Sequence, residues 1–252
     1  MSEEIQTAVI GGSGLTELKG LQVVAKREAA TPYGTPSAPL YIGDFHGHPV
    51  VFLARHGVRH SLPPHQVNYQ ANLWALHSVG VKQVFAVAAV GGIHSDLGPG
   101  QLAVPDQLID YTWGRAHSFS DVDDVSHIDF THPYTPKLRD RLLLAAKQAG
   151  VEVLEHGTYG VTQGPRLETA AEVRRLRRDG CDMVGMTAMP EAALARELEV
   201  DYASLAVSVN WAAGAGPQGS DIHAEIEETL SEGMAKARAI LAQALKLATH
   251  LE

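Results

Sequence analysis

The residues most able to bind a ligand follow apolar runs, where a strand would end and a loop would begin. In α/β folds the ends of neighbouring strands meet at one edge of the sheet, and ligands collect there. Hydroxyl, guanidinium, imidazole and amide groups that converge at such an edge suit an anion beside a polar ring. The sequence therefore predicts one site assembled from distant segments, with these residues as candidates: Ser13, Arg55, His56, Met186, Thr187 and Asn210.

The first candidate lies in a glycine-rich stretch, IGGSGLTE at residues 10–17. Glycine-rich backbone after a strand can offer N–H groups to an anion. The stretch does not match the dinucleotide fingerprint, because counting from Gly12 its last glycine position holds Glu17. It also lacks the G-K-S/T ending of a P-loop. A plain tight turn and an anion-binding turn both remain open here.

The ARHG motif at residues 54–57 places Arg55 beside His56 at the end of a second apolar run. A guanidinium can bind phosphate or carboxylate in a bidentate fork, and the imidazole adds a second donor. A surface ion pair is an equally good interpretation of the arginine.

Three other candidates also have a purely structural alternative. Thr187 could cap the helix that Pro190 and Glu191 open, as an N-terminal proline and acid do. Glu168 could stabilise a helix start through its charge, or could point into a pocket and recognise a ligand. The amide of Asn210 could face a heterocycle or tie down its own loop.

Two segments carry residue types that can bind metal. The histidines of residues 56–65 form a His-x3-His-x4-His pattern, but Pro63 and Pro64 break any helix that would align them. An acidic loop at residues 121–132 could serve a metal-dependent hydrolase, although turn-forming aspartates are commoner in such loops. We expect no metal site, and the loop's candidate ligands are Asp121, Asp123, Asp124, His127, Asp129 and His132.

Composition places these residues in one globular domain over residues 1–252. The chain is 45% hydrophobic and 19% charged, and its formal charge of -9 with scattered basic residues argues against nucleic acid as a partner. The RRLRR run at residues 174–178 fits a solvated helix face. Cys181 alone forms no disulfide framework, no export signal is evident, and the apolar windows are about ten residues long. A soluble, cytoplasmic protein without membrane association is expected.

Short apolar runs alternate with segments of helical period, which predicts an α/β domain with a largely buried sheet. The predicted strands are residues 7–14, 49–57, 83–92, 100–111, 181–186 and 202–210. The predicted helices are residues 66–79, 136–149, 168–179, 190–198 and 224–251.

Taken together and in this order, the motifs resemble the trimeric purine nucleoside phosphorylase and methylthioadenosine phosphorylase family over nearly the whole chain. The resemblance implies a single α/β domain with a central, distorted mixed sheet flanked by helices. It also implies a homotrimer with active sites near subunit boundaries, or a dimer of trimers. The motifs are IGGSGL (10–15), ARHG (54–57), VNYQANLWAL (67–76), GPRLET (164–169), GMTAMPE (185–191) and Asn210.

The family splits a purine nucleoside with inorganic phosphate, a co-substrate, and uses no metal or organic cofactor. Its phosphate site matches Ser13, Arg55, His56, Thr187 and the backbone near Ala89. These groups would hold the dianion under the sugar.

The same resemblance assigns the nucleoside side of the site. Met186 matches the residue that packs against the pentose, and Leu167 lies where the family often stacks a phenylalanine. Asn210 and Glu168 match the two groups that hold the base and stabilise it as it leaves, and they are the expected catalytic residues.

The predicted substrate follows from positions at which this chain differs from other members of the family. Family members that act on 6-aminopurines carry aspartates where this chain has Asn210 and Ala212, so a 6-oxopurine is expected. Ile226, with Ile222 nearby, replaces the histidine that meets the sugar 5′-hydroxyl in 6-oxopurine nucleoside members. His127 matches a residue that methylthio-specific members contribute from a neighbouring subunit. The predicted substrate is 5′-methylthioinosine, with inosine or guanosine and methylthioadenosine as alternatives.

Overall fold

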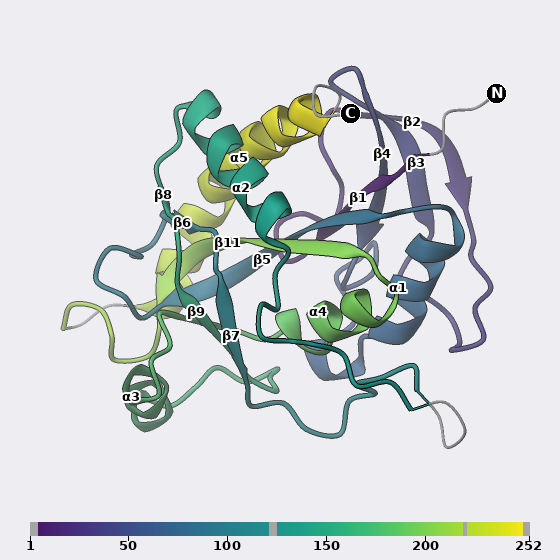
Figure 1. The fold of residues 1–252 in the computed structure, drawn as a ribbon. Coiled ribbons are helices and arrows are strands. Elements are labelled where there is room, and N and C mark those ends of the chain that lie inside the picture. The colour runs from purple at the N-terminus through teal and green to yellow at the C-terminus, as the bar shows by residue number, and fades with distance from the viewer. Residues whose placement is uncertain (1–4, 121–124, 219–220, 249–252) are drawn as a thin grey trace.

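The computed structural model describes residues 5–120, 125–218 and 221–248, and one mixed sheet runs through it (Figure 1). The strands are β1 (Thr7–Gly11), β2 (Leu21–Arg27), β3 (Leu40–Phe45), β4 (His48–Ala54), β5 (Gln83–Gly92), β6 (Leu102–Ala103), β7 (Gln107–Asp110), β8 (Val153–Leu154), β9 (Thr158–Val161), β10 (Met183–Gly185) and β11 (Asp201–Trp211). The helices are α1 (Tyr69–Ser78), α2 (Pro136–Ala149), α3 (Ala170–Arg178), α4 (Ala188–Glu197) and α5 (Ile222–Ala248), with a short 3-10 turn η1 at Pro64–Gln66.

Strand β5 is the centre of the sheet and pairs with three other strands. Its first half runs parallel to β1, its end runs antiparallel to β10, and β11 pairs in parallel along its other edge. The sheet therefore forks at β5, which gives the mixed, distorted arrangement that the resemblance implied. The main path runs β2-β3-β4-β1-β5-β10-β9-β7, and β11 continues through β6 to β8.

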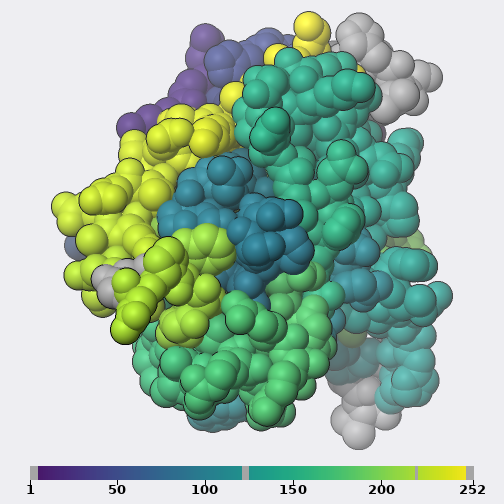
Figure 2. Space-filling view, turned by 90° about the vertical axis from the view of Figure 1, so that its left-hand side faces the viewer, coloured from purple at the N-terminus to yellow at the C-terminus, as the bar shows by residue number. Residues whose placement is uncertain are grey.

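Helices cover both faces of this sheet. Helices α2 and α5 lie together over β11 on one side, and α1 and α4 pack together on the other (Figure 1). In the space-filling view, blue surface from the region around β5 is framed by yellow, teal and green surface from later parts of the chain (Figure 2). The inward faces are apolar, as a sheet buried on both sides requires. None of the helices among the described residues is long and apolar enough to cross a membrane.

The α/β fold class is confirmed, and every predicted strand and helix has a counterpart. The predicted strand at residues 100–111 is two strands, β6 and β7, because Pro105 interrupts it. The hairpin of β2 and β3 was not predicted; β2 is an edge strand whose side chains are nearly all exposed, so it lacks an apolar pattern.

Parallel strands bring the predicted site residues to one edge of the sheet. Strands β4, β1, β5 and β11 all run in the same direction, so the segments after Ala54, Gly11 and Trp211 lie at the same end. Strand β10 arrives from the opposite direction and leads into residues 186–187 beside β5. The site therefore forms where five strands end or meet.

Candidate active site

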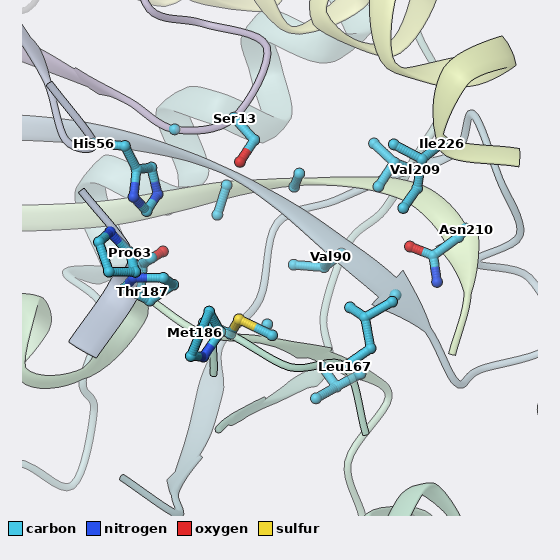
Figure 3. Close-up of a pocket in the computed structure, with 18 of the residues that line it drawn as sticks. Ser13, His56, Pro63, Val90, Leu167, Met186, Thr187, Val209, Asn210 and Ile226 are labelled. Atoms are coloured by element: carbon cyan, nitrogen blue, oxygen red, sulfur yellow. The ribbon is translucent and has the colours of Figure 1, made fainter. Parts of the chain in front are cut away.

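A cavity of about 450 Å³ occupies this edge of the sheet, within the usual size range of small-molecule sites. His56, Pro63 and Thr187 lie at one end and Asn210 at the other, with Met186 and Val90 between them (Figure 3). The predicted site residues that line it are Ser13, Arg55, His56, Ala89, Leu167, Glu168, Met186, Thr187, Asn210, Ala212, Ile222 and Ile226. His127 is exposed on the segment after residue 124 and does not line this cavity.

The turn after β1 places Ser13 against the cavity. Gly12 accepts a hydrogen bond from the N–H of Leu15, so a tight turn is present, and Ser13 projects from it into the cavity (Figure 3). A Cβ on Gly12 would come within 2.9 Å of Nη1 of Arg55, so only glycine allows this approach. The tight-turn interpretation of the glycine-rich stretch is therefore confirmed, and the turn also places the Ser13 hydroxyl at the cavity.

Arg55 forms a buried ion pair that sequence reasoning did not predict. Its Nε and Nη2 each donate to a carboxylate oxygen of Glu191 at 2.7 Å, and Nη1 donates to the Val87 carbonyl at 2.9 Å. The side chains are 1% and 0% exposed. Burial lowers the pKa of Arg55, but the Glu191 carboxylate more than offsets this, so the pKa is raised and the charge is held. The surface ion pair considered for Arg55 is therefore a core pair.

Glu191 corrects a second expectation. It lies in the first turn of α4, as predicted, but it is completely buried and also accepts a hydrogen bond from the Tyr202 hydroxyl at 2.8 Å. Its carboxylate neutralises Arg55 rather than serving only the helix start. Two N–H groups of the five on the guanidinium remain for other acceptors at the cavity wall.

His56 presents an acceptor to the cavity. Its Nδ1 lies 2.8 Å from the Leu62 carbonyl oxygen, which can only accept, so Nδ1 carries the proton. Burial and then the neighbouring Arg55 charge lower the pKa of His56 from 6.5 to about 4. The ring is therefore neutral near pH 7, with Nε2 as an acceptor. Sequence reasoning treated this imidazole as a second donor, and the hydrogen bond to Leu62 reverses that assignment.

This buried neutral histidine predicts acid sensitivity. Between pH 6.5 and 4 the unfolded chain binds the proton that folded His56 does not, so stability falls as the pH drops through this window. From pH 7 to pH 5 the loss from this group is about 2 kcal/mol in the free energy of unfolding. Urea unfolding of the wild type and of His56→Asn at both pH values measures it. His65→Asn changes an exposed histidine of the same segment, so its free energy of unfolding should depend on pH as that of the wild type does. If the free energy of unfolding of His56→Asn also fell as much as that of the wild type between pH 7 and pH 5, His56 would not be the cause of the acid sensitivity.

Thr187 occupies the position before α4 but does not cap the helix. Its side chain makes no cap hydrogen bond, although it is only 6% exposed. The capping interpretation therefore lacks its defining contact. Thr187 instead lies near His56 and Pro63 at one end of the cavity (Figure 3).

Glu168 is likewise not needed for its helix. The start of α3 is satisfied by a capping box in which Thr169 and Glu172 exchange hydrogen bonds, one residue after Glu168. Glu168 accepts a hydrogen bond from the Thr162 hydroxyl at 2.6 Å and lines the cavity. A carboxylate fixed by a neighbouring hydroxyl can receive an N–H of a ligand with its remaining lone pairs.

A β-bulge turns Asn210 into the cavity. The pairing of β11 with β5 shifts between Ser208 and Asn210, so the consecutive residues Val209 and Asn210 both line the cavity instead of alternating. The Asn210 Nδ2 donates to the Trp211 carbonyl at 2.6 Å, which leaves the amide oxygen facing inward (Figure 3). Asn210 therefore both ties down its loop and presents an acceptor.

An apolar wall closes the cavity on the side of α5. Ile222, Ile226 and Leu230 follow one another at four-residue intervals, so they share one helix face, and Val209 completes the wall. The helix is held there because Glu225 accepts from the Trp211 N–H at 2.9 Å and Thr229 donates to the Val209 carbonyl at 2.7 Å. Leu230 was not predicted, although its spacing from Ile226 would have indicated it.

His60 also lines the cavity, although the sequence did not predict it there. Its ring lies 3.4 Å from the Ser13 hydroxyl and packs 4.8 Å from the ring of His56. Within residues 5–120, 125–218 and 221–248, no three His, Cys, Asp or Glu side chains are grouped closely enough to hold a metal ion. Asp121, Asp123 and Asp124 of the acidic loop lie outside the described residues.

Comparison with known proteins gives a consistent result. The profile of the Phosphorylase superfamily matches residues 6–246. A protein of Pseudomonas syringae pv. tomato named "Probable S-methyl-5'-thioinosine phosphorylase" is 55% identical over 240 residues, 94% of this chain and 97% of the relative. A "Probable 6-oxopurine nucleoside phosphorylase" of Thermococcus kodakarensis is 43% identical over 246 residues, 95% of this chain and 91% of the relative.

Among solved structures, methylthioadenosine phosphorylase from Schistosoma mansoni in complex with adenine superposes with a TM-score of 0.92. The two are 30% identical, and the match covers 98% of this chain and 93% of that one. The similarity thus extends over the whole fold and includes every segment that builds the cavity.

Proposed function

Because the chain belongs to the Phosphorylase superfamily and its relatives are nucleoside phosphorylases, which are pentosyltransferases, we propose that it cleaves S-methyl-5′-thioinosine with inorganic phosphate. The products are hypoxanthine and 5-methylthioribose 1-phosphate, a purine salvage reaction. A phosphate oxygen bonds to C1′ as the bond from C1′ to N9 breaks. The proton of hydrogen phosphate ends on the departing purine, so the reaction balances.

Phosphate binds at the end formed by Ser13, His56 and Thr187, with the backbone near Ala89. The hydroxyls donate to phosphate oxygens. Neutral His56 accepts a hydrogen bond from the hydroxyl of hydrogen phosphate at Nε2, which orients the nucleophile before this proton passes to the purine. Arg55 offers its two remaining N–H groups at the wall, with Glu191 fixing the orientation of the guanidinium.

The purine lies at the opposite end, against Glu168 and Asn210. The Glu168 carboxylate accepts the N1–H of a 6-oxopurine, and the inward-facing Asn210 oxygen accepts the proton that N7 gains as the base leaves. This contact forms as charge develops, so it stabilises the transition state more than the ground state. Leu167 covers the base and Met186 the pentose.

The apolar wall of Val209, Ile222, Ile226 and Leu230 is the observation that selects the 5′-methylthio substrate. A 5′-hydroxyl placed against this wall would lose a hydrogen bond, which costs about 1–3 kcal/mol, whereas a methylthio group gains from apolar contact. Ala212 at the base end offers no carboxylate to a 6-amino group.

A phosphate-dependent assay with methylthioinosine, inosine, guanosine and methylthioadenosine tests the proposal. We expect kcat/KM for methylthioinosine to exceed that for inosine about 10- to 100-fold, following the cost of an unpaired hydroxyl. Comparable values for inosine would favour a 6-oxopurine nucleoside phosphorylase, like the relative from Thermococcus kodakarensis. Loss of activity with EDTA would favour the metal-dependent hydrolase.

Ile226→His should shift the preference in this assay. The imidazole would give the 5′-hydroxyl a partner and crowd the methylthio group, so the ratio of inosine to methylthioinosine turnover should rise about tenfold. Ile226→Val keeps the wall apolar and should leave the ratio close to that of the wild type. An unchanged ratio in Ile226→His would place the sugar 5′ end elsewhere.

Glu168→Gln and Glu172→Gln separate recognition of the base from helix capping. Glu168→Gln removes the charge that accepts N1–H, and KM for methylthioinosine should rise about 10-fold or more, as for loss of a charged hydrogen bond of about 1.5–3 kcal/mol. Glu172→Gln weakens only the capping box and its pair with Arg166, so it should change stability but not KM. If Glu168→Gln had the same KM for methylthioinosine as Glu172→Gln, Glu168 would have no role in binding the base.

The remaining proposals concern assembly and location. We take residues 1–252 as one nucleoside phosphorylase domain that works in the cytoplasm without a cofactor. It assembles as a homotrimer, with a dimer of trimers as the larger alternative. His127 is exposed and so is available to reach the cavity of a neighbouring subunit, as its match in methylthio-specific members does. Analytical ultracentrifugation measures the assembly directly.

A further inference from the structure

Arg115 holds the backbone of two segments that line the cavity. It belongs to residues 111–120, an irregular stretch that follows β7, and its side chain is half-buried. No motif in the sequence singled it out. Its position becomes informative only through the groups that its guanidinium contacts.

All three guanidinium nitrogens donate hydrogen bonds to these segments. Nη1 donates to the carbonyls of Met186 and Met189 at 2.8 and 2.5 Å. Nη2 donates to the carbonyls of Gln163 and Thr162 at 2.9 and 3.3 Å, and Nε donates to the Gln163 side-chain oxygen at 3.2 Å. A guanidinium has five N–H groups, and these five acceptors equal them in number. The Tyr69 hydroxyl is a sixth and longer contact, 3.4 Å from Nη1.

These acceptors lead directly to the two ends of the cavity. Thr162, held through its carbonyl, donates its hydroxyl to Glu168 at 2.6 Å. Met186, held in the same way, lines the cavity and is followed by Thr187. The guanidinium also lies over the ring of Tyr69, 5.4 Å from its centroid. Arg115 thus joins the segment that carries the base-binding carboxylate to the segment under the sugar and phosphate.

We infer that Arg115 is a positioning residue that sets the distance between Glu168 and the part of the cavity wall formed by Met186 and Thr187. This inference rests on the proposed function. It touches no substrate. Reaction requires the purine and C1′ to be held in register with phosphate, and a displacement of about 1 Å lowers the rate about 100-fold.

Only a guanidinium can fill this role. Lysine carries three N–H groups on a single nitrogen and cannot reach acceptors arranged around a plane. Arg115→Lys would therefore keep the charge but release at least two of the five acceptors. The released carbonyls would let residues 162–163 and 186–189 move relative to each other.

Arg115→Lys and Arg115→Ala test the inference, with kcat and KM for methylthioinosine and phosphate as the readout. We expect kcat to fall about 100-fold in both variants, with millimolar guanidinium chloride restoring part of the activity of Arg115→Ala. Arg139→Lys is the matched control, because Arg139 also donates to backbone carbonyls, those of Pro105, Val104 and Glu155, away from the cavity. It should lower thermal stability without changing kcat. Wild-type kcat in folded Arg115→Lys would overturn the inference.

A crystal structure of Arg115→Lys separates this inference from the proposed function. We expect the Met186 and Thr162 carbonyls to move apart or together by about 1 Å relative to the wild type. Unchanged positions would overturn the positioning role whatever the activity. A wild-type enzyme that released no base would instead overturn the proposed function, and the crystal structure would still decide the role of Arg115.

Discussion

Asn210→Ala is expected to lower kcat and kcat/KM for methylthioinosine by a similar factor of about 100 or more. The Asn210 oxygen faces the cavity and is fixed by the Nδ2 hydrogen bond to the Trp211 carbonyl. Its contact with N7 strengthens only as the purine leaves, so its loss acts on the transition state and leaves KM little changed. Steady-state kinetics with saturating phosphate measure both constants.

Two further variants make this result specific. Asn68→Ala removes an amide that caps α1 away from the cavity, so it should change stability but not kcat. Asn210→Asp replaces the amide by an acceptor that suits a 6-amino group, and it should raise the turnover of methylthioadenosine relative to methylthioinosine. An unchanged ratio in Asn210→Asp would mean that Asn210 does not read the base.

Glu191→Ala is expected to destabilise the protein by about 3–5 kcal/mol, because it leaves the Arg55 charge buried without its partner. That is a large part of the 5–15 kcal/mol by which folded proteins are usually stable. Chemical denaturation measures the free energy of unfolding. The exposed pair of Arg166 and Glu172 gives the comparison, and Arg166→Ala should cost no more than about 1 kcal/mol.

Replacing all three residues of the Arg55, Glu191 and Tyr202 network by apolar residues shows why Glu191→Ala is unstable. It distinguishes the effect of an unpaired charge from the effect of lost packing. The triple variant Arg55→Met, Glu191→Leu, Tyr202→Phe contains neither the charges nor the hydroxyl that bonds to them. Its stability should return close to that of the wild type, while phosphate binding weakens. A triple variant as unstable as Glu191→Ala would show that the charge is not the cause.

The sequence predicted those cavity residues that directly follow the end of a strand. Ser13, Arg55 and Thr187 each come directly after an apolar run, and parallel pairing brings such positions together. The resemblance then supplied Glu168, Ile222 and Ile226, which no local pattern places at this cavity. The helix starts were less exact: α3 begins at Ala170 and α5 at Ile222, each two residues from the predicted start. Thr169 with Glu172, and Asp221, are the capping signals that mark these starts.

The long-range contacts could not be predicted in this way. Arg55 and Glu191 are 136 residues apart, and neither residue type indicates burial. The bulge that turns Asn210 inward depends on the pairing of β11 with β5, which a single strand does not reveal. Arg115 lies in an irregular stretch and acts through backbone carbonyls, which are identical in every residue. Such contacts depend on the assembled fold.

A crystal structure with hypoxanthine and phosphate bound is the measurement that decides the account. It should show hypoxanthine N1 within hydrogen-bond distance of Glu168, N7 facing the Asn210 amide oxygen, and phosphate between Ser13, His56 and Thr187. The space between the two ligands should open toward Ile226 and Leu230. Ligands bound elsewhere, or a base that contacts neither Glu168 nor Asn210, would contradict it.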